Sequence, residues 1–272
     1  MELNTDMKFY LSTTADIEVA DESAWPIEIV NTMKSANLAK THGMGIEIAE
    51  FCISENLESG FDKTCKEVYS KTELVPDVVL HAPYNELLPC AIEPKVLEVA
   101  KFRYDQAWGL CKKYGAKKMI VHSGFYNQMF FESWFTERAI VFWKEFLETH
   151  PDDITICMEN VVEVSPDSML KVAEGVNDPR FKLTFDVGHA HRSSKIPVME
   201  WLEKLAPHIS HFHIHNNEGV YDTHNALGNG TIPMEDFLNH AKSLCPDATF
   251  TVESLDLENS LTWLEEKGFL NA

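Results

Sequence analysis

Several features that are scarce or missing in this 272-residue chain each exclude a class of protein. Its six cysteines form no C-x-x-C pair, so neither a disulfide framework nor a thiolate zinc site is predicted. No apolar run approaches the ~20 residues needed to cross a bilayer, and residues 1–8 lack the basic-then-apolar order of a signal peptide. We therefore expect a cytoplasmic protein with reduced thiols and no membrane partner.

Basic residues are also scarce, since 23 lysines and arginines face 43 aspartates and glutamates, which gives a formal net charge of -20. Such a surface repels phosphate polymers unless bound cations or a local basic patch reverse its sign. Nucleic acid is therefore an unlikely partner, and a small-molecule substrate is expected instead.

Short β-rich runs alternate with longer amphipathic segments along the whole chain, a pattern typical of repeated βα units. No long linker interrupts the alternation, and no G-x-G-x-x-G turn supports an open doubly wound sheet. The length also suits one eightfold barrel. The sequence therefore predicts an α/β fold, a single (β/α)8 TIM barrel that forms one domain over residues 1–272. The predicted strands are residues 8–12, 45–51, 77–82, 117–123, 155–160, 182–187, 209–215 and 249–254, and helices are expected at 94–114, 133–150 and 258–267.

Side chains that can bind metals follow the ends of these strands, where barrel enzymes carry their functional groups. Any one of them alone would more often be a packed or hydrogen-bonded residue. Buried carboxylates are costly unless they are paired or bound to metal, so their conjunction at one mouth predicts a metal site. Carboxylates and imidazoles without cysteine suit zinc or manganese, with one to three divalent ions per chain. The predicted ligands are His81, His122, Glu159, Asp186, His189, His213, Asp222, His224 and Glu253.

The segments H-A-P-Y, E-N, D-V-G-H and D-T-H-N-A-L-G-N-G resemble the xylose isomerase-like barrel superfamily, which includes endonuclease IV and sugar phosphate isomerases and epimerases. The resemblance spans nearly the whole chain. It implies that the nine predicted ligands correspond to those that hold three zinc ions in endonuclease IV. For the isomerases and epimerases it implies one metal bound by Glu159, Asp186, His213 and Glu253, with the two glutamates moving the proton beside the substrate carbonyl.

Two enzymatic functions remain open at this point. The number of ligands favours metal-assisted hydrolysis of a phosphoester other than DNA. The alternative is isomerisation or epimerisation of a small sugar or sugar phosphate, with Glu159 and Glu253 as the catalytic acid and base. The acidic surface and an aromatic loop after the fourth strand, uncharged except for Glu132, fit this alternative better. A barrel that binds a ligand without turnover is a third, less favoured interpretation.

Further residues are predicted to contact substrate. Tyr84 follows the third strand, and Trp134 belongs to the aromatic loop, whose rings either form a lid or simply pack the next helix. Arg192 and Lys195, in an expected loop after His189, are candidate cations for one phosphate group.

Three histidines alternate along the seventh strand, so the strand register decides which one binds metal. His213 is level with the other strand-end ligands and is assigned to the metal. His211 is expected one pleat deeper, with a packing or hydrogen-bonding role. His215 is expected further out, where it touches substrate or supports the loop of Asp222 and His224.

Overall fold

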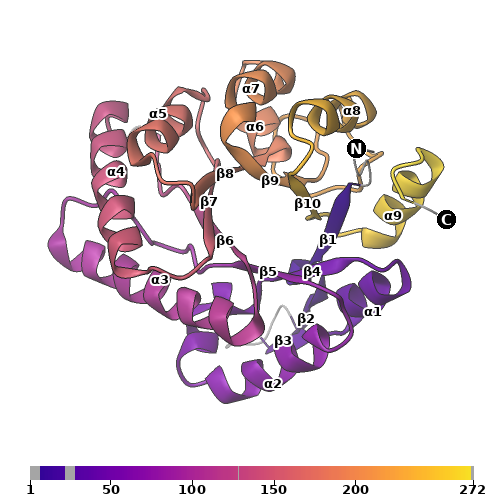
Figure 1. Cartoon of the computed structure of the whole chain (residues 1–272). Coiled ribbons are helices and arrows are strands. Elements are labelled where there is room, and N and C mark those ends of the chain that lie inside the picture. Colours follow the sequence, from indigo (N-terminus) through magenta and orange to yellow (C-terminus); the bar gives the residue numbers. More distant parts are fainter. Residues whose placement is uncertain (1–6, 22–27, 128, 271–272) are drawn as a thin grey trace.

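The computed structural model describes residues 7–21, 28–127 and 129–270, and its centre is a closed barrel of eight parallel strands (Figure 1). The strands follow one another around the barrel in the order β1, β10, β9, β8, β7, β6, β5, β4. The predicted TIM barrel is confirmed. The bounds of the strands are Lys8–Ser12 (β1), Gly45–Ile48 (β4), Val78–His81 (β5), Lys118–His122 (β6), Thr155–Glu159 (β7), Phe181–Asp186 (β8), Ile209–Ile214 (β9) and Thr249–Val252 (β10).

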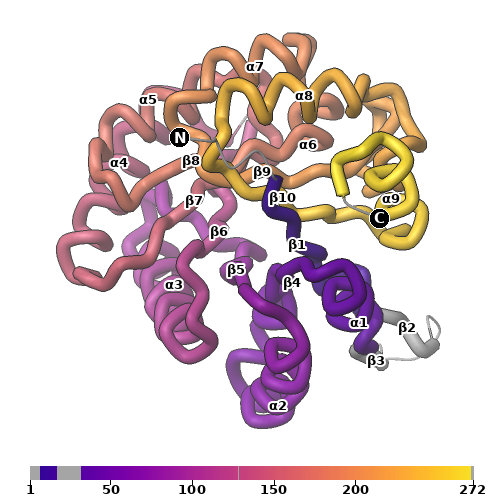
Figure 2. Tube along the Cα trace, turned by 45° about the vertical axis from the view of Figure 1, so that its right-hand side comes forward, coloured from indigo at the N-terminus to yellow at the C-terminus, as the bar shows by residue number. Residues whose placement is uncertain are grey.

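Helices surround the barrel, and the last of them closes the ring by lying beside the first strand and first helix (Figures 1 and 2). An imidazole nitrogen of His42, at the end of α1, lies 3.2 Å from a carboxylate oxygen of Glu265 in α9. Within the described residues, no helix is both long and apolar enough to span a membrane. The helices are Lys34–Thr41 (α1), Phe61–Thr72 (α2), Pro94–Tyr114 (α3), Glu132–Thr149 (α4), Asp167–Val176 (α5), Val187–Ser193 (α6), Val198–Leu205 (α7), Met234–Leu244 (α8) and Leu257–Glu266 (α9).

Two local predictions were wrong, and one pair of strands was not predicted. The strand expected at 45–51 ends at Ile48, because Glu50–Cys52 form a 3-10 turn. An antiparallel hairpin of β2 (Ile17–Asp21) and β3 (Glu28–Asn31) follows β1 and had not been predicted. Arg192 belongs to α6 rather than to a loop, because β8 runs straight into that helix with no turn residues between them.

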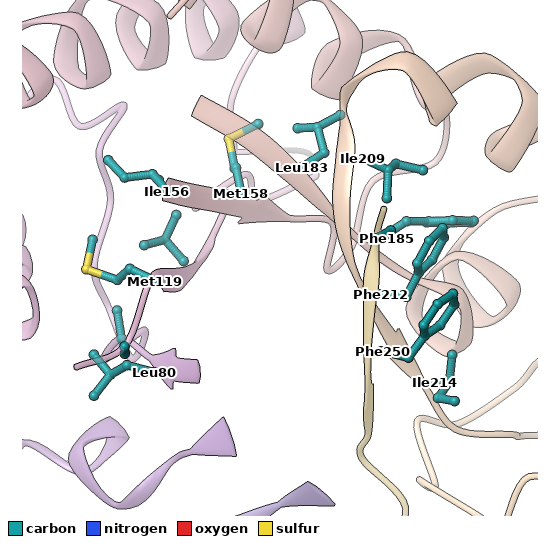
Figure 3. Packing of buried hydrophobic residues seen from close by; sticks show 14 of the residues in the cluster. Leu80, Met119, Ile156, Met158, Leu183, Phe185, Ile209, Phe212, Ile214 and Phe250 are labelled. Atoms are coloured by element: carbon teal, nitrogen blue, oxygen red, sulfur yellow. The ribbon is translucent and has the colours of Figure 1, made fainter. Parts of the chain in front are cut away.

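The strands carry two different faces, which determines where the site can form. Outward-pointing side chains such as Phe185, Phe212 and Phe250 fill the layer between sheet and helices, where the last two rings stack with centroids 4.7 Å apart (Figure 3). A separate buried apolar cluster is formed by Tyr10, Val79, Ile120 and Cys157. These four alternate along their strands with the outward residues, so they lie on the inner face of the barrel. Polar residues take over on this inner face towards the carboxyl ends of the strands.

Candidate metal centre

The strand register brings four predicted ligands together at the carboxyl end of the barrel. Asp186 of β8 is the direct partner of His213 in β9, and Glu253 directly follows β10, which pairs with β9. Glu159 ends β7, which pairs with β8. One donor atom from each of these residues lies within 4.8 Å of the others, and all four residues are buried. We call Glu159, Asp186, His213 and Glu253 the central cluster.

Unsatisfied polar atoms face one another inside the central cluster. Nδ1 of His213 lies 3.3 Å from Glu159 Oε1, 3.4 Å from Glu253 Oε2 and 3.8 Å from Asp186 Oδ2. Among the described residues, Glu159 Oε1, Asp186 Oδ2 and His213 Nδ1 have no hydrogen-bond partner. Buried carboxylates this close together repel each other strongly. A divalent cation would compensate that charge and satisfy these atoms, so the residues fit a metal.

The charges of the central cluster stabilise one another. Burial alone would raise the pKa of Glu159, but the nearby His213 and His122 imidazoles hold it well below its usual range. Burial alone would lower the pKa of His213, but the carboxylates of Glu253, Glu47 and Glu159 raise it well above its usual range. Glu159 is thus ionised at neutral pH, and a metal ion would take the place of the proton on His213.

A second cluster shares Glu159 with the first. Oε2 of Glu159 lies 3.3 Å from Nε2 of His81 and 3.5 Å from Nε2 of His122. Tyr84 stacks on His122 with ring centroids 4.1 Å apart, and the thiol sulfur of Cys52 lies 3.4 Å from His81 Nδ1. We call His81, His122 and Glu159 the side cluster.

A third cluster lies nearer the rim of the barrel. Oδ2 of Asp222 lies 3.1 Å from Nε2 of His189 and 3.3 Å from Nε2 of His224. His215 joins them, since one donor atom from each of these four residues lies within 4.8 Å of the others. We call His189, His215, Asp222 and His224 the outer cluster. With it, the structure places all nine predicted ligands in three adjoining groups.

Glu47 is a buried carboxylate of the same region that the sequence analysis missed. It lies within β4, deeper in the barrel than the residues at the strand ends, and its Oε1 is 3.1 Å from His213 Nε2. Its Oε2 accepts hydrogen bonds from Thr251 at 2.6 Å and from His211 Nε2 at 3.1 Å. Burial lowers the pKa of His211 to about 4, so this ring is neutral at pH 7 and its Nε2–H donates to Glu47. A glutamate between two outward isoleucines, Ile46 and Ile48, is the sequence signal that marks it as facing the barrel interior.

We expect Glu47→Gln to weaken divalent-metal binding by about 10- to 100-fold, because Glu47 fixes the tautomer and orientation of the His213 ring. Titration of the metal-stripped protein with zinc, followed by calorimetry, measures this affinity. Glu55→Gln, at an exposed position shortly after β4, is the matched control and should bind zinc with the same affinity as the wild type. Unchanged affinity in Glu47→Gln would contradict the positioning role.

A cavity of about 300 Å³ opens onto all three clusters. Among the described residues, none of those lining it is a lysine or arginine, so a ligand meets carboxylates, imidazoles, a few neutral polar groups and apolar groups. The lining residues are Thr14, Ala49, Cys52, His81, Tyr84, His122, Glu159, Val161, His189, Asp222, His224, Glu253 and Leu255.

Four predicted substrate contacts do not line this cavity. Trp134 is 49% exposed and packs edge-on against Phe131, while Phe135 is buried in the core. Arg192 and Lys195 are exposed, and neither lines the cavity. His215 is fully buried, so in this structure it contacts the outer cluster and not the cavity surface.

Comparisons with known proteins agree with this architecture. A family model described as xylose isomerase-like TIM barrel matches residues 38–271. A D-tagatose 3-epimerase-like protein is 23% identical, covers 96% of this chain and 97% of its own, and superposes with a TM-score of 0.75. The TTHB071 protein from Thermus thermophilus, solved after soaking with ZnCl2, is 22% identical. The alignment covers 98% of this chain and 100% of that protein, with a TM-score of 0.72. D-Psicose 3-epimerase from Clostridium cellulolyticum, solved with D-tagatose, is 12% identical. The alignment covers 97% of this chain and 99% of that protein, with a TM-score of 0.71. At these identities the likeness to solved structures shows the fold alone.

Proposed function

The chain belongs to the xylose isomerase-like TIM barrel family, and we propose that it isomerises or epimerises a small sugar at a carbon beside a carbonyl group. The observation that carries this proposal is the position of two glutamates. Glu159 and Glu253 both line the cavity, and the strands that bear them, β7 and β10, are separated in the barrel by β8 and β9. The two carboxylates therefore approach a bound substrate from different sides.

Two opposed carboxylates suit a reaction that removes a proton from one face of a carbon and returns one to the other. A metal in the central cluster would polarise the carbonyl and hydroxyl oxygens of the substrate. Glu159, which its imidazole neighbours keep ionised, is able to accept a proton. One glutamate takes the proton from the carbon, and the other donates a proton to the opposite face, which inverts the configuration.

The cavity also limits the substrate. Its volume of about 300 Å³ is at the small end of ligand pockets. Because no lysine or arginine is among its described lining residues, we propose an unphosphorylated sugar over a sugar phosphate. Imidazole and carboxylate groups can bind sugar hydroxyls by hydrogen bonds. The solved epimerase with D-tagatose supports this choice of substrate class, and the zinc-soaked relative supports a divalent metal such as zinc or manganese.

Incubation of the metal-loaded protein with ketohexoses in D2O tests the proposal. We expect one deuterium to appear at the carbon beside the carbonyl, together with the epimeric or isomeric sugar, as seen by NMR and mass spectrometry. Absence of exchange across a panel of ketoses and aldoses, with metal shown to be bound, would contradict it.

Phosphoester hydrolysis is the second candidate, and the side and outer clusters are the observation that favours it. Multinuclear sites of this kind bind phosphoryl oxygens and generate hydroxide. Release of nitrophenol from nitrophenyl phosphate mono- and diesters by the metal-loaded protein, without any sugar exchange, would favour hydrolysis over epimerisation.

Duplex DNA containing an abasic site is expected to bind only weakly, even at low salt, and to remain uncut. A polyanion on a surface of charge -20 requires local basic groups, and no lysine or arginine is among the described residues that line the cavity. Fluorescence anisotropy with labelled abasic duplex, followed by gel analysis, measures both properties. Sub-micromolar, salt-sensitive binding with incision would restore a DNA-directed function.

A further inference from the structure

We propose that His215 is the fourth protein ligand of the outer cluster, which makes this cluster a closed, structural metal site that anchors the segment between β9 and α8. The family resemblance supplies only His189, Asp222 and His224 as ligands. The fourth donor comes from the structure, and the inference does not depend on which reaction the central cluster catalyses.

Two histidines of the outer cluster are already oriented for metal binding. Nδ1 of His189 donates to the backbone carbonyl of Asn160 at 2.9 Å, and Nδ1 of His224 donates to that of Glu253 at 2.8 Å. A proton held on Nδ1 leaves the Nε2 lone pair free. In both residues Nε2 points to the carboxylate of Asp222.

His215 has donor atoms that nothing in the described protein satisfies. Its side chain is fully buried, yet neither ring nitrogen has a hydrogen-bond partner among the described residues. Nε2 lies 3.8 Å from Asp222 Oδ1 and 3.3 Å from Asp186 Oδ1. Leaving a buried polar group unpaired destabilises a folded protein, and a shared metal ion would satisfy this ring.

Gly188 shows that the chain makes room for His215 at this position. A Cβ atom on Gly188 would lie 2.1 Å from Cε1 of the His215 ring, so any larger residue would displace the imidazole. Gly188 belongs to the D-V-G-H segment and directly precedes His189. The ring of His215 therefore packs against the backbone that carries another ligand of the same cluster.

The segment that carries Asp222 and His224 has a strained backbone. His224 has a φ of 45°, in the left-handed region that a histidine rarely adopts. Its ring stacks on His215 with centroids 3.9 Å apart, and Asn225 pairs with Asn216 beyond β9. Because imidazole donates in its ring plane, one of these two rings must rotate out of the stack for both to bind one ion. An ion bound to all four residues would fix this segment to β9 and α6.

Four protein ligands complete the tetrahedral coordination that structural zinc sites have. The central cluster also offers four donors, so what identifies the ion of the outer cluster is its faster release when His215 is replaced. The zinc-loaded full chain is mixed with a chelating pyridylazo dye, whose absorbance follows the zinc that is released. In the wild type, one equivalent of zinc per chain should be released slowly.

We expect His215→Asn to release that equivalent at least tenfold faster, and Gly188→Ala, which displaces the ring without removing it, to do the same. His208→Ala, at the opposite end of β9, is the control and should keep the slow phase. Circular dichroism establishes that each variant is folded, and Gly188→Ala tests the proposal if His215→Asn does not fold. The proposal is overturned if the wild type shows no slow equivalent, or if a folded His215→Asn variant keeps it. No substrate is needed, so failure here is separate from failure of the proposed epimerase function.

Discussion

Replacement of Glu253 by glutamine is expected to lower the rate of sugar epimerisation or isomerisation by about 10²- to 10⁴-fold, the usual contribution of a positioned acid or base. Glutamine keeps the size of the side chain but cannot accept and return a proton. It also removes one anionic donor from the central cluster, 3.4 Å from Nδ1 of His213. Metal content is therefore expected to fall together with turnover.

Measurement of turnover at saturating metal separates these two effects, since added metal restores occupancy but not proton transfer. Glu258→Gln, at an exposed position in α9, is the matched control and should retain wild-type turnover and metal content. A Glu253→Gln variant with full turnover and full metal content would show that this carboxylate belongs to neither the metal site nor the reaction.

The fold could be predicted because its signal repeats along the chain. Each strand is a short apolar run followed by an amphipathic segment, and where turn chemistry is clear the boundaries agree closely. Helix α3 has the predicted bounds, with Pro94 in its first turn and Gly115 at a φ of 76° after its last residue. Prediction failed where that chemistry is absent. Asp186 both ends β8 and caps α6, with its Oδ1 accepting from the backbone N–H of His189 at 2.7 Å.

Positions at strand ends and in the loop after the seventh strand predict nine ligands at one mouth of the barrel, but position in the sequence does not show how deep a side chain lies. Glu47 was missed because it lies inside a strand, where only the inward direction of its side chain distinguishes it from a surface glutamate. Trp134, Arg192 and Lys195 were proposed from nearness in sequence, which does not report the direction of a side chain. His215 was assigned a supporting or substrate-binding role, whereas its buried, unpaired ring suggests a ligand.

The number of bound metal ions does not by itself distinguish hydrolysis from epimerisation. A closed outer site would add one ion to either enzyme, so a protein with two or more equivalents could still be an epimerase. What distinguishes the two functions is the chemistry at the central cluster, where Glu159 and Glu253 line the cavity. Sugar proton exchange therefore decides the function more directly than metal analysis does.

Replacement of His213 by alanine is expected to weaken metal binding at the central cluster by more than 100-fold, beyond the 10- to 100-fold typical of losing a residue that only supports a ligand. His213 is the imidazole of that cluster, and its Nδ1 faces all three carboxylates. Turnover should be lost with the metal. Calorimetric metal titration and the sugar exchange assay measure both effects, and His208→Ala, at the far end of β9, should change neither.

His211→Gln should keep the central metal, because His211 lies deeper and hydrogen-bonds Thr249, Thr251 and Glu47. If a folded His213→Ala variant retained turnover while His211→Gln lost both turnover and metal, the donor of β9 would lie two residues deeper than the structure places it.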